Sequence, residues 1–216
     1  MADDLTLYGS ADYASPYVFS AFVALKEKGL QFQYQGMSLE RREHDRPEYR
    51  DPSVTGRVPA LRHGDFWLAE SSAIDEYLED AFPPPKHQRL YPADLRARAR
   101  VRMVQALVRS DFMPIREERP TSSVFLGKPV KPLTAGAKVA VERLLRIADA
   151  LVPSAKGYIA GEFSPADADL ALMLQRLVAN GDPVPEKLRG YAAAIWARPS
   201  VQAWLTNAKA GGRPAP

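Results

Sequence analysis

A short segment near residue 70 places a carboxylate and two hydroxyl groups at a predicted helix start. Glu70 is followed directly by Ser71 and Ser72, and apolar side chains then recur at helical spacing over residues 74–81. A serine hydroxyl and the free backbone N–H groups of a helix N-terminus can hold a carboxylate. With acidic Glu70 beside them, these residues predict a binding site for a zwitterionic group that carries both a carboxylate and an ammonium.

A proline interrupts a strand pattern just upstream of this segment. Residues 57–61 are Arg-Val-Pro-Ala-Leu, which suits a strand start except that Pro59 has no N–H for a sheet ladder. A cis Val58–Pro59 bond would resolve this conflict and would leave the backbone of Val58 free to pair with an extended peptide. Taken singly, the proline could lie in an ordinary loop, and Glu70 and Ser71 could form an ordinary helix cap. Found together and in this order, they favour a site for a small peptide.

A third hydroxyl group lies at a helix start near the N-terminus. Ser15 precedes Pro16, which suits the first helical position, and the helical pattern ends at Gly29. A helix N-terminus carries positive potential, and a serine hydroxyl there can donate a hydrogen bond to sulfur, so a bound thiol would lose its proton more easily. The simpler alternative is that Ser15 only caps the helix.

The elements that would position these residues fall into two regions on either side of a proline-rich stretch. Strand patterns alternate with helix patterns first as β-α-β and then as β-β-α, whereas every later pattern is helical. The sequence therefore predicts an α/β thioredoxin-like N-terminal domain over residues 1–82, a proline-rich linker over 83–92 and an all-α helical-bundle C-terminal domain over 93–216. Within the last region, helices are expected at 95–112, 134–152 and 164–179, and a loop at 124–132.

Two groups of polar residues stand out in the helical region. Ser164 and Asp167, with proline between them, form a capping box whose expected role is folding and not chemistry. The second group follows the first long helix and could line a substrate site or form a salt-bridge network with a methionine packed in it. Its members are Arg109, Asp111, Met113 and Arg116.

Composition limits the function classes. The chain has 216 residues, of which 46% are hydrophobic and 25% charged, so it can form two domains with cores of their own. A net charge of +3 is too small for a nucleic-acid footprint, and the alternating arginines of residues 96–102 suit a solvated or interface-bridging surface. No apolar run approaches a membrane span, and the acidic start lacks the features of a secretory signal, which predicts a cytoplasmic protein.

Neither metal chemistry nor cysteine chemistry of the chain's own is expected. The sequence contains no cysteine, which excludes disulfides, thiolate metal sites and a redox-active cysteine. His44, His63 and His87 lie in separate segments without metal-ligand spacing, so we expect ordinary surface or loop histidines and no metal.

The motifs above resemble those of the soluble glutathione transferases, and most closely those of the bacterial YfcF type with a serine in the active site. The resemblance extends over essentially the whole chain. It is most specific in three segments, namely Ser-Pro-Tyr-Val at 15–18, Glu-Ser-Ser-Ala-Ile at 70–74 and Met-Pro-Ile-Arg-Glu-Glu-Arg-Pro-Thr at 113–121. It implies a homodimeric enzyme that transfers the thiol of glutathione to an electrophile, or uses it to reduce hydroperoxides or disulfides. A non-catalytic protein that carries glutathione or hydrophobic ligands on the same fold is the alternative.

The resemblance also implies roles for single residues. Ser15 would stabilise the glutathione thiolate, although Tyr8 and Tyr13 are rivals because a first-strand tyrosine has this role in other branches of the family. Glu70 and Ser71 would hold the γ-glutamyl end of glutathione.

The remaining contacts to glutathione are less well matched. Val58 would pair with the backbone of the tripeptide. Residues 51–57 depart from the family pattern, so the contacts to the glycine carboxylate stay open, with Arg57 as the best candidate.

Overall fold

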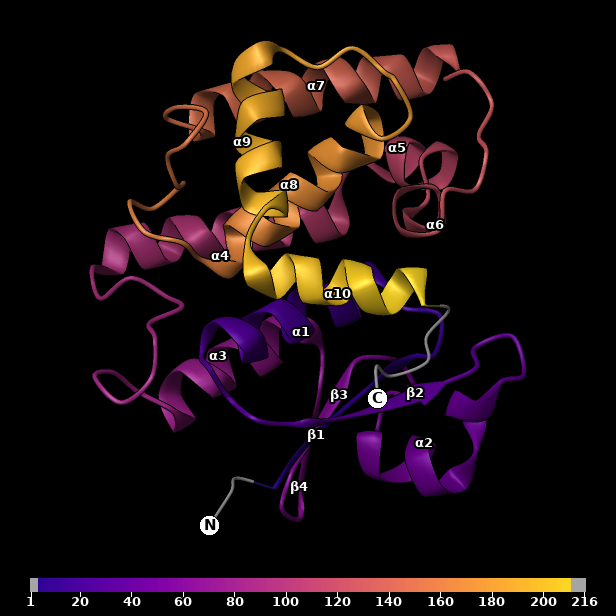
Figure 1. Cartoon of the computed structure of the whole chain (residues 1–216), viewed down its shortest axis with the longest axis vertical. Helices are drawn as coiled ribbons and strands as arrows, with labels where there is room; N and C mark the ends of the chain where they lie inside the picture. Colours follow the sequence, from indigo (N-terminus) through magenta and orange to yellow (C-terminus); the bar gives the residue numbers. More distant parts are fainter. Residues whose placement is uncertain (1–3, 211–216) are drawn as a thin grey trace. The chain divides into compact units, whose positions relative to one another are not determined.

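The computed structural model describes residues 4–210 and separates them into two compact units (Figure 1). The first unit runs to Leu90 and includes the stretch that begins at Ala203, and the second unit is Tyr91–Gln202. The sequence instead places that last stretch with the helical domain. The difference has a physical cause, because the indole of Trp204 is fully buried, with its centroid 4.8 Å from the ring of Tyr13 and 5.8 Å from that of Phe19. The acidic start, up to residue 3, lies outside the described residues.

A four-stranded sheet forms the centre of the first unit. Its strands are β1 Leu5–Ser10, β2 Gln33–Met37, β3 Ala60–His63 and β4 Phe66–Ala69, in the order β2-β1-β3-β4. β1 and β2 are parallel, whereas β3 is antiparallel to both β1 and β4. The helices of this unit are α1 Pro16–Glu27, α2 Pro47–Ser53 and α3 Ser71–Ala81, with a short 3-10 helix, η1, at Glu43–Asp45. This is the predicted thioredoxin-like arrangement of β-α-β followed by β-β-α.

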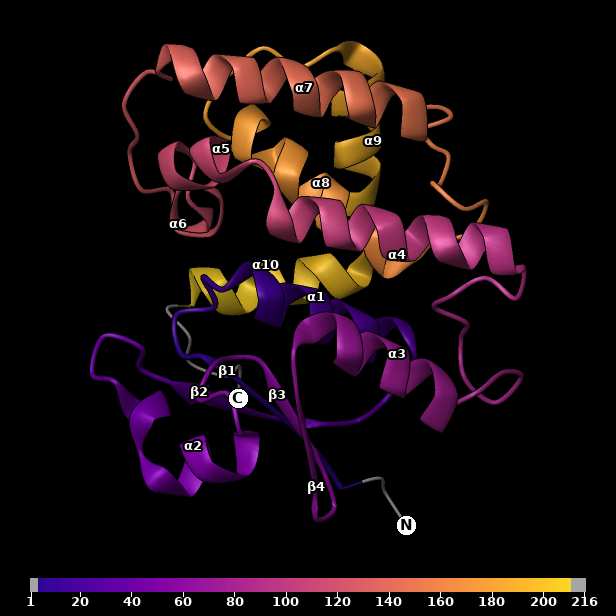
Figure 2. The ribbon, with the colours of Figure 1, turned by 180° about the vertical axis from the view of Figure 1, so that it is seen from behind.

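The helices of the first unit cover both faces of the sheet. Helices α1 and α3 lie together on one face, and α2 lies on the other (Figures 1 and 2). The core beneath α1 and α3 contains fully buried side chains such as Leu7, Phe19 and Ile74. α1 ends where Gly29 takes a φ of 70°, a conformation that glycine adopts without steric cost. This packing fixes the amino end of α1, where Ser15 is found.

A buried ion pair joins the far end of α1 to α3. Lys28 is fully buried, and its Nζ lies 2.9 Å from the Glu79 carboxylate. The same ammonium donates hydrogen bonds to the carbonyl oxygens of Phe82 and Gln88, at 2.8 and 3.0 Å. Because an unpaired buried charge costs several kcal/mol, roughly 3 to 5, this pair holds α1, α3 and the segment after α3 in one arrangement.

The second unit is helical. Its elements are α4 Leu95–Ser110, α5 Met113–Glu118, α6 Thr121–Phe125, α7 Ala135–Leu151, α8 Pro165–Val178 and α9 Glu186–Trp196, and α10 Pro199–Lys209 begins in it. The predicted long helices are confirmed within two residues at each end. The expected loop at 124–132 begins later than predicted, because α6 continues to Phe125.

Helix α8 forms the core of the second unit, with every residue from Pro165 to Leu177 buried. The predicted capping box is present at its start, where the Asp167 carboxylate accepts the Ser164 N–H at 2.9 Å. That carboxylate also accepts the Ile159 N–H and the Tyr191 hydroxyl, both at 2.9 Å. Asp167 therefore connects three segments of one core, which fits a folding role. Among residues 4–210 no helix is both long and apolar enough to cross a membrane.

Candidate active site

The register of the sheet brings the predicted site residues to one edge of the first unit. β3 begins at Ala60 and β4 ends at Ala69, and these two residues are direct partners across the ladder. Val58 lies two residues before the first of them, and Glu70 follows the second. Ser15 follows the end of β1, whose Tyr8 is the other ladder partner of Ala60. The carboxyl ends of the parallel strands β1 and β2 point to this edge, which is where ligands bind in many α/β folds.

A pocket of about 390 Å³ opens at this edge. Its lining residues all belong to the first unit and are Ser10, Asp12, Ala14, Ser15, Pro16, Tyr17, Leu39, His44, Arg57 and Val58. Three of the five predicted site residues are thus brought together, namely Ser15, Arg57 and Val58. Glu70 and Ser71 lie beside the edge through the β3–β4 register but are not among the lining residues.

Ser15 is the N-cap of α1, as predicted. Its Oγ accepts the Val18 N–H at 3.3 Å, and its own N–H donates to the Ser10 Oγ at the same distance. Because a serine hydroxyl has one proton to donate as well as two acceptor sites, its cap bond leaves the proton available to a ligand. The first turn of α1 contains no acidic residue, so the positive potential of the helix end is not offset there.

The segment before β3 also matches the prediction. The Val58–Pro59 peptide bond is cis. Val58 is half-buried and packs against a small cluster that includes Met37, Tyr49 and Ala60. The hydroxyl of Tyr49 donates a hydrogen bond to the carbonyl oxygen of Arg57, which fixes the backbone at the pocket wall.

Glu70 occupies an unusual backbone position. It precedes α3 as its N-cap residue with φ 70° and ψ 114°, and its side chain makes no capping bond. Positive φ is uncommon for residues other than glycine and persists only where the surrounding structure imposes it. Ser71 is the first residue of α3 and is 3% exposed, which confirms the predicted helix start. The Glu70 carboxylate is exposed and has no hydrogen bond or ion pair within residues 4–210.

The two rival tyrosines lie elsewhere. Tyr8 stacks on Trp67 with ring centroids 4.7 Å apart, and Tyr13 stacks on Tyr34 at 4.4 Å. Tyr13 is only 2% exposed, and burial raises the pKa of its hydroxyl to about 12. Neither tyrosine lines the pocket.

Sequence reasoning missed several lining residues, of which His44 has the most reactive side chain. It was expected to be an ordinary surface or loop histidine, but it lines the pocket with a side chain that is 24% exposed. Its Nδ1 is buried and has no hydrogen-bond partner among the described residues. No pattern could have revealed this, because His44 lies in η1, within an irregular segment whose path is set by tertiary contacts.

The charges at the pocket have both signs. Arg57 and Asp12 are exposed lining residues, and the Asp12 carboxylate accepts the Ala14 N–H at 3.0 Å. A ligand with separated positive and negative groups would complement such a wall. Within residues 4–210 no cluster of three or more His, Cys, Asp or Glu residues could hold a metal ion.

The polar group after α4 forms a salt-bridge network in the second unit. Arg109 pairs with Asp169 at 2.7 Å, and Arg116 donates to the Arg109 carbonyl oxygen at 2.6 Å. Asp111 pairs with Arg143, also at 2.6 Å. The sequence leaves two roles open for these residues, a substrate site or a salt-bridge network. The contacts of Arg109, Asp111 and Arg116 match the salt-bridge network. The remaining member, Met113, is 46% exposed.

A thioredoxin-like unit with a pocket at the sheet edge, joined to a helical unit, defines a glutathione transferase fold. Comparison with known families agrees over both parts of the chain. Residues 7–86 match the model of the N-terminal domain of glutathione S-transferases, and residues 94–209 match a model of the C-terminal domain. The chain belongs to the glutathione S-transferase family, and the predicted fold class is confirmed.

Individual relatives show the same likeness. Glutathione S-transferase 3 of Zea mays is 31% identical over 209 residues, covering 93% of this chain and 86% of the relative. The matches to glutathione S-transferase 1 of Dianthus caryophyllus (40% identical) and to maleylpyruvate isomerase of a Ralstonia species (37%) span 43% and 45% of this chain and less than half of each relative.

Solved structures extend the likeness to the whole fold. A glutathione transferase homologue from Burkholderia, crystallised with bound glutathione, is 40% identical with a TM-score of 0.78, covering 96% of this chain and 99% of that one. A diazinon-metabolising glutathione S-transferase of Bombyx mori has a TM-score of 0.79 at 21% identity, with 97% and 99% covered, and shows the fold alone.

Proposed function

We propose that this chain is a serine-type glutathione transferase that binds glutathione in the pocket of the first unit. The observation that carries the proposal is the position of Ser15 in that pocket. Its Oγ already accepts a backbone N–H, so its proton can be donated to the sulfur of glutathione. The hydroxyl and the positive end of α1 together stabilise the thiolate and lower the pKa of the bound thiol. The chain has no cysteine, so the reactive sulfur comes from glutathione.

The rest of the site suits the shape of the tripeptide. Val58 pairs through its backbone with the extended cysteinyl part, and Glu70 with Ser71 holds the zwitterionic γ-glutamyl end. Arg57 and His44 bind the glycine carboxylate. The exposed guanidinium of Arg57 and the buried, unpartnered Nδ1 of His44, both on the pocket wall, support this assignment.

The chemical step is an attack of the thiolate on a small electrophile. A bond forms between the sulfur and the electrophilic atom, the leaving group departs with its bonding electrons, and the thiol proton has already passed to water. Holding both reactants in one orientation supplies much of the acceleration. The second substrate is a small electrophile, a hydroperoxide or a disulfide, and the protein works as a homodimer of the YfcF type in the cytoplasm. These finer statements rest on the resemblance of the motifs at 15–18, 70–74 and 113–121.

A substrate panel tests the proposal. Steady-state turnover is measured with glutathione and an aryl halide, an organic hydroperoxide or a mixed disulfide, using the natural chain and Ser15→Ala. We expect turnover with at least one class and its loss in the variant. If the natural chain binds glutathione but turns over none of the three substrate classes, the result would instead support the non-catalytic alternative. The exposed serine of α4, Ser110, offers a matched control, because Ser110→Ala removes a hydroxyl outside the pocket.

A further inference from the structure

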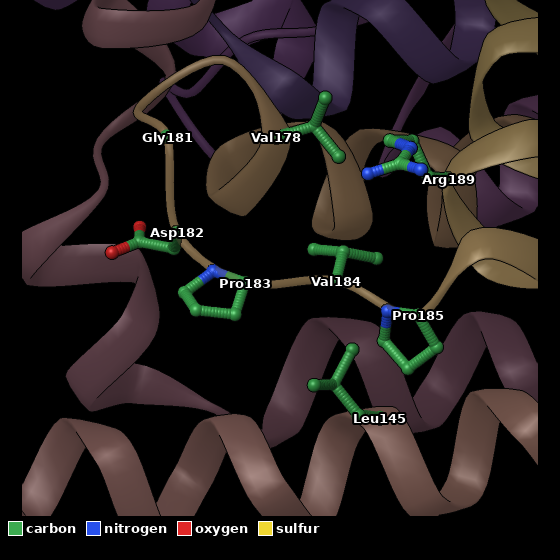
Figure 3. Close-up of a pocket in the computed structure, with 8 residues that line it drawn as sticks. All are labelled: Leu145, Val178, Gly181, Asp182, Pro183, Val184, Pro185 and Arg189. Carbon is green, nitrogen blue, oxygen red and sulfur yellow. The ribbon is translucent and has the colours of Figure 1, made fainter.

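A second cavity, of about 670 Å³, lies within the helical unit (Figure 3). Its wall consists of Leu145 on α7, Val178 at the end of α8, the loop over residues 181–185 and Arg189 on α9. This volume is within the range of small-molecule sites, which extends from about 300 to 1,000 Å³. All of its lining residues belong to the second unit, whereas the glutathione pocket is lined by the first unit alone.

The wall of this cavity is mainly apolar. Leu145 points toward the loop, and Val184 of the loop points toward Val178 and Arg189 (Figure 3). The rings of Pro183 and Pro185 flank Val184. Aliphatic side chains on α7, α8 and the loop thus present a surface on which an apolar body could be buried.

One cation in the wall is available to a ligand. Arg189 is exposed, and its guanidinium is turned toward Val178 (Figure 3). Across the described part of the chain its side chain has no hydrogen bond or ion pair. The acidic lining residue, Asp182, points away from Val184 and pairs with Arg119 through both carboxylate oxygens. The charge that the cavity offers to a ligand is therefore positive.

The loop that forms the wall is held in place. Gly181 has a φ of 75°, and the Asp182 N–H donates to the Leu177 carbonyl oxygen at 3.0 Å, which closes the end of α8. Arg119, which is 3% exposed, anchors Asp182 from the other side. The two prolines of the loop further restrict its backbone. The cavity is thus largely pre-formed, as small-molecule sites usually are.

We infer that this cavity is a binding site for an amphipathic monocarboxylic acid, separate from the glutathione pocket. The alkyl or aryl body of the acid would lie against Leu145, Val178 and Val184, and its carboxylate would pair with the Arg189 guanidinium. A planar guanidinium can meet a carboxylate through two parallel hydrogen bonds, which gives the site a preference for this head group over a neutral one.

The test uses octanoate and its neutral analogue octanamide, which share an apolar chain and differ in charge. Both are titrated into the full-length protein with labelled leucine and valine methyl groups and followed by NMR. We expect octanoate to shift the signals of Leu145, Val178 and Val184 and to bind more tightly than octanamide. Arg189→Gln should weaken octanoate binding about tenfold, close to the effect of one charge-assisted hydrogen bond at an exposed site, and should leave octanamide binding unchanged.

The matched control is Arg146→Gln, which removes the same charge from an exposed arginine on α7 outside the cavity wall. It should leave octanoate binding unchanged. Equal losses in both variants would mean that net charge alone attracts the acid, and shifts confined to methyl groups outside this cavity would place the acid elsewhere. Either result would overturn the inference, as would equal affinity for octanoate and octanamide. Glutathione binding, measured in the same samples, should be native in both variants because neither residue belongs to the first unit.

Discussion

Replacing Ser15 by alanine removes a hydroxyl group that we assign to two roles. As the N-cap of α1 it accepts the Val18 N–H, and as a donor to sulfur it would stabilise the glutathione thiolate. The loss of a serine cap costs about 0.5 to 2 kcal/mol, and the cap bond of 3.3 Å is long enough to place this one in the lower part of the range. The loss of a hydrogen bond to a charged sulfur costs roughly 1.5 to 3 kcal/mol.

The loss of the hydrogen bond to the glutathione sulfur determines the effect on activity. Since one pKa unit corresponds to about 1.36 kcal/mol, the pKa of the bound thiol should rise by about one to two units in Ser15→Ala. The thiolate would then form only at higher pH, and turnover at neutral pH should fall by about ten- to a hundredfold. The ultraviolet absorbance of the thiolate, titrated against pH with bound glutathione, measures this shift directly.

Two comparisons separate the roles of the hydroxyl. Ser15→Gly keeps most of the stability of the helix cap and still lacks the donor, so it should match Ser15→Ala in thiol pKa while unfolding nearer to the native midpoint. Tyr8→Phe and Tyr13→Phe should leave the titration unmoved. If the midpoint stays constant in both serine variants and moves in either tyrosine variant, the activating hydroxyl belongs to tyrosine and our assignment of Ser15 is wrong.

Three further predictions concern Glu70, Asp167 and Tyr13. Glu70→Gln should weaken glutathione binding by about 1 to 3 kcal/mol in calorimetry through the loss of a charge-assisted contact, and native affinity would contradict its assignment. Asp167→Ala should lower the unfolding midpoint because it removes the acceptor of four buried donors, yet turnover per folded molecule should persist; native stability with lost activity would refute the folding role. Burial raises the pKa of Tyr13 to about 12, so its neutral form adds stability that is complete below pH 10, the unfolded value, and is lost as pH rises through about 12. Tyr13→Phe should reduce the alkaline loss of stability between these values, and an unchanged alkaline profile would show that Tyr13 does not titrate in this way.

The parts of the molecule that could be predicted from the sequence are those that depend on local chemistry. Ser15 with proline after it, and Ser164 with Asp167 three residues later, specify helix starts through contacts within one turn. The cis Val58–Pro59 bond follows from a proline in a strand pattern. These features involve neighbours in sequence, so a single sequence contains all the information needed to recognise them.

The parts that could not be predicted depend on contacts between distant segments. His44 reaches the pocket wall because η1 and α2 fold back beside the sheet edge. The residues around it show neither a helical nor a strand pattern of apolar side chains, so the sequence does not predict this path. Trp204 lies in the first unit, where its indole meets the rings of Tyr13, Phe19 and Phe22, nearly two hundred residues away in sequence. The positive φ of Glu70 is likewise imposed by its surroundings, because its residue type gives no sign of it.

The strand geometry explains why Ser15 and not Tyr8 lines the pocket. Side chains alternate across a strand, so Tyr8 and Leu7 of β1 point to opposite faces of the sheet. Leu7 enters the buried core of the unit, and Tyr8 instead joins Tyr49 and Trp67 in a cluster whose rings surround it. The phenol is thereby held along the sheet face, whereas Ser15 lies beyond the end of β1, where α1 begins and the pocket opens. In the proposed mechanism, the short hydroxyl of Ser15 would reach the sulfur of bound glutathione there without moving any part of the core.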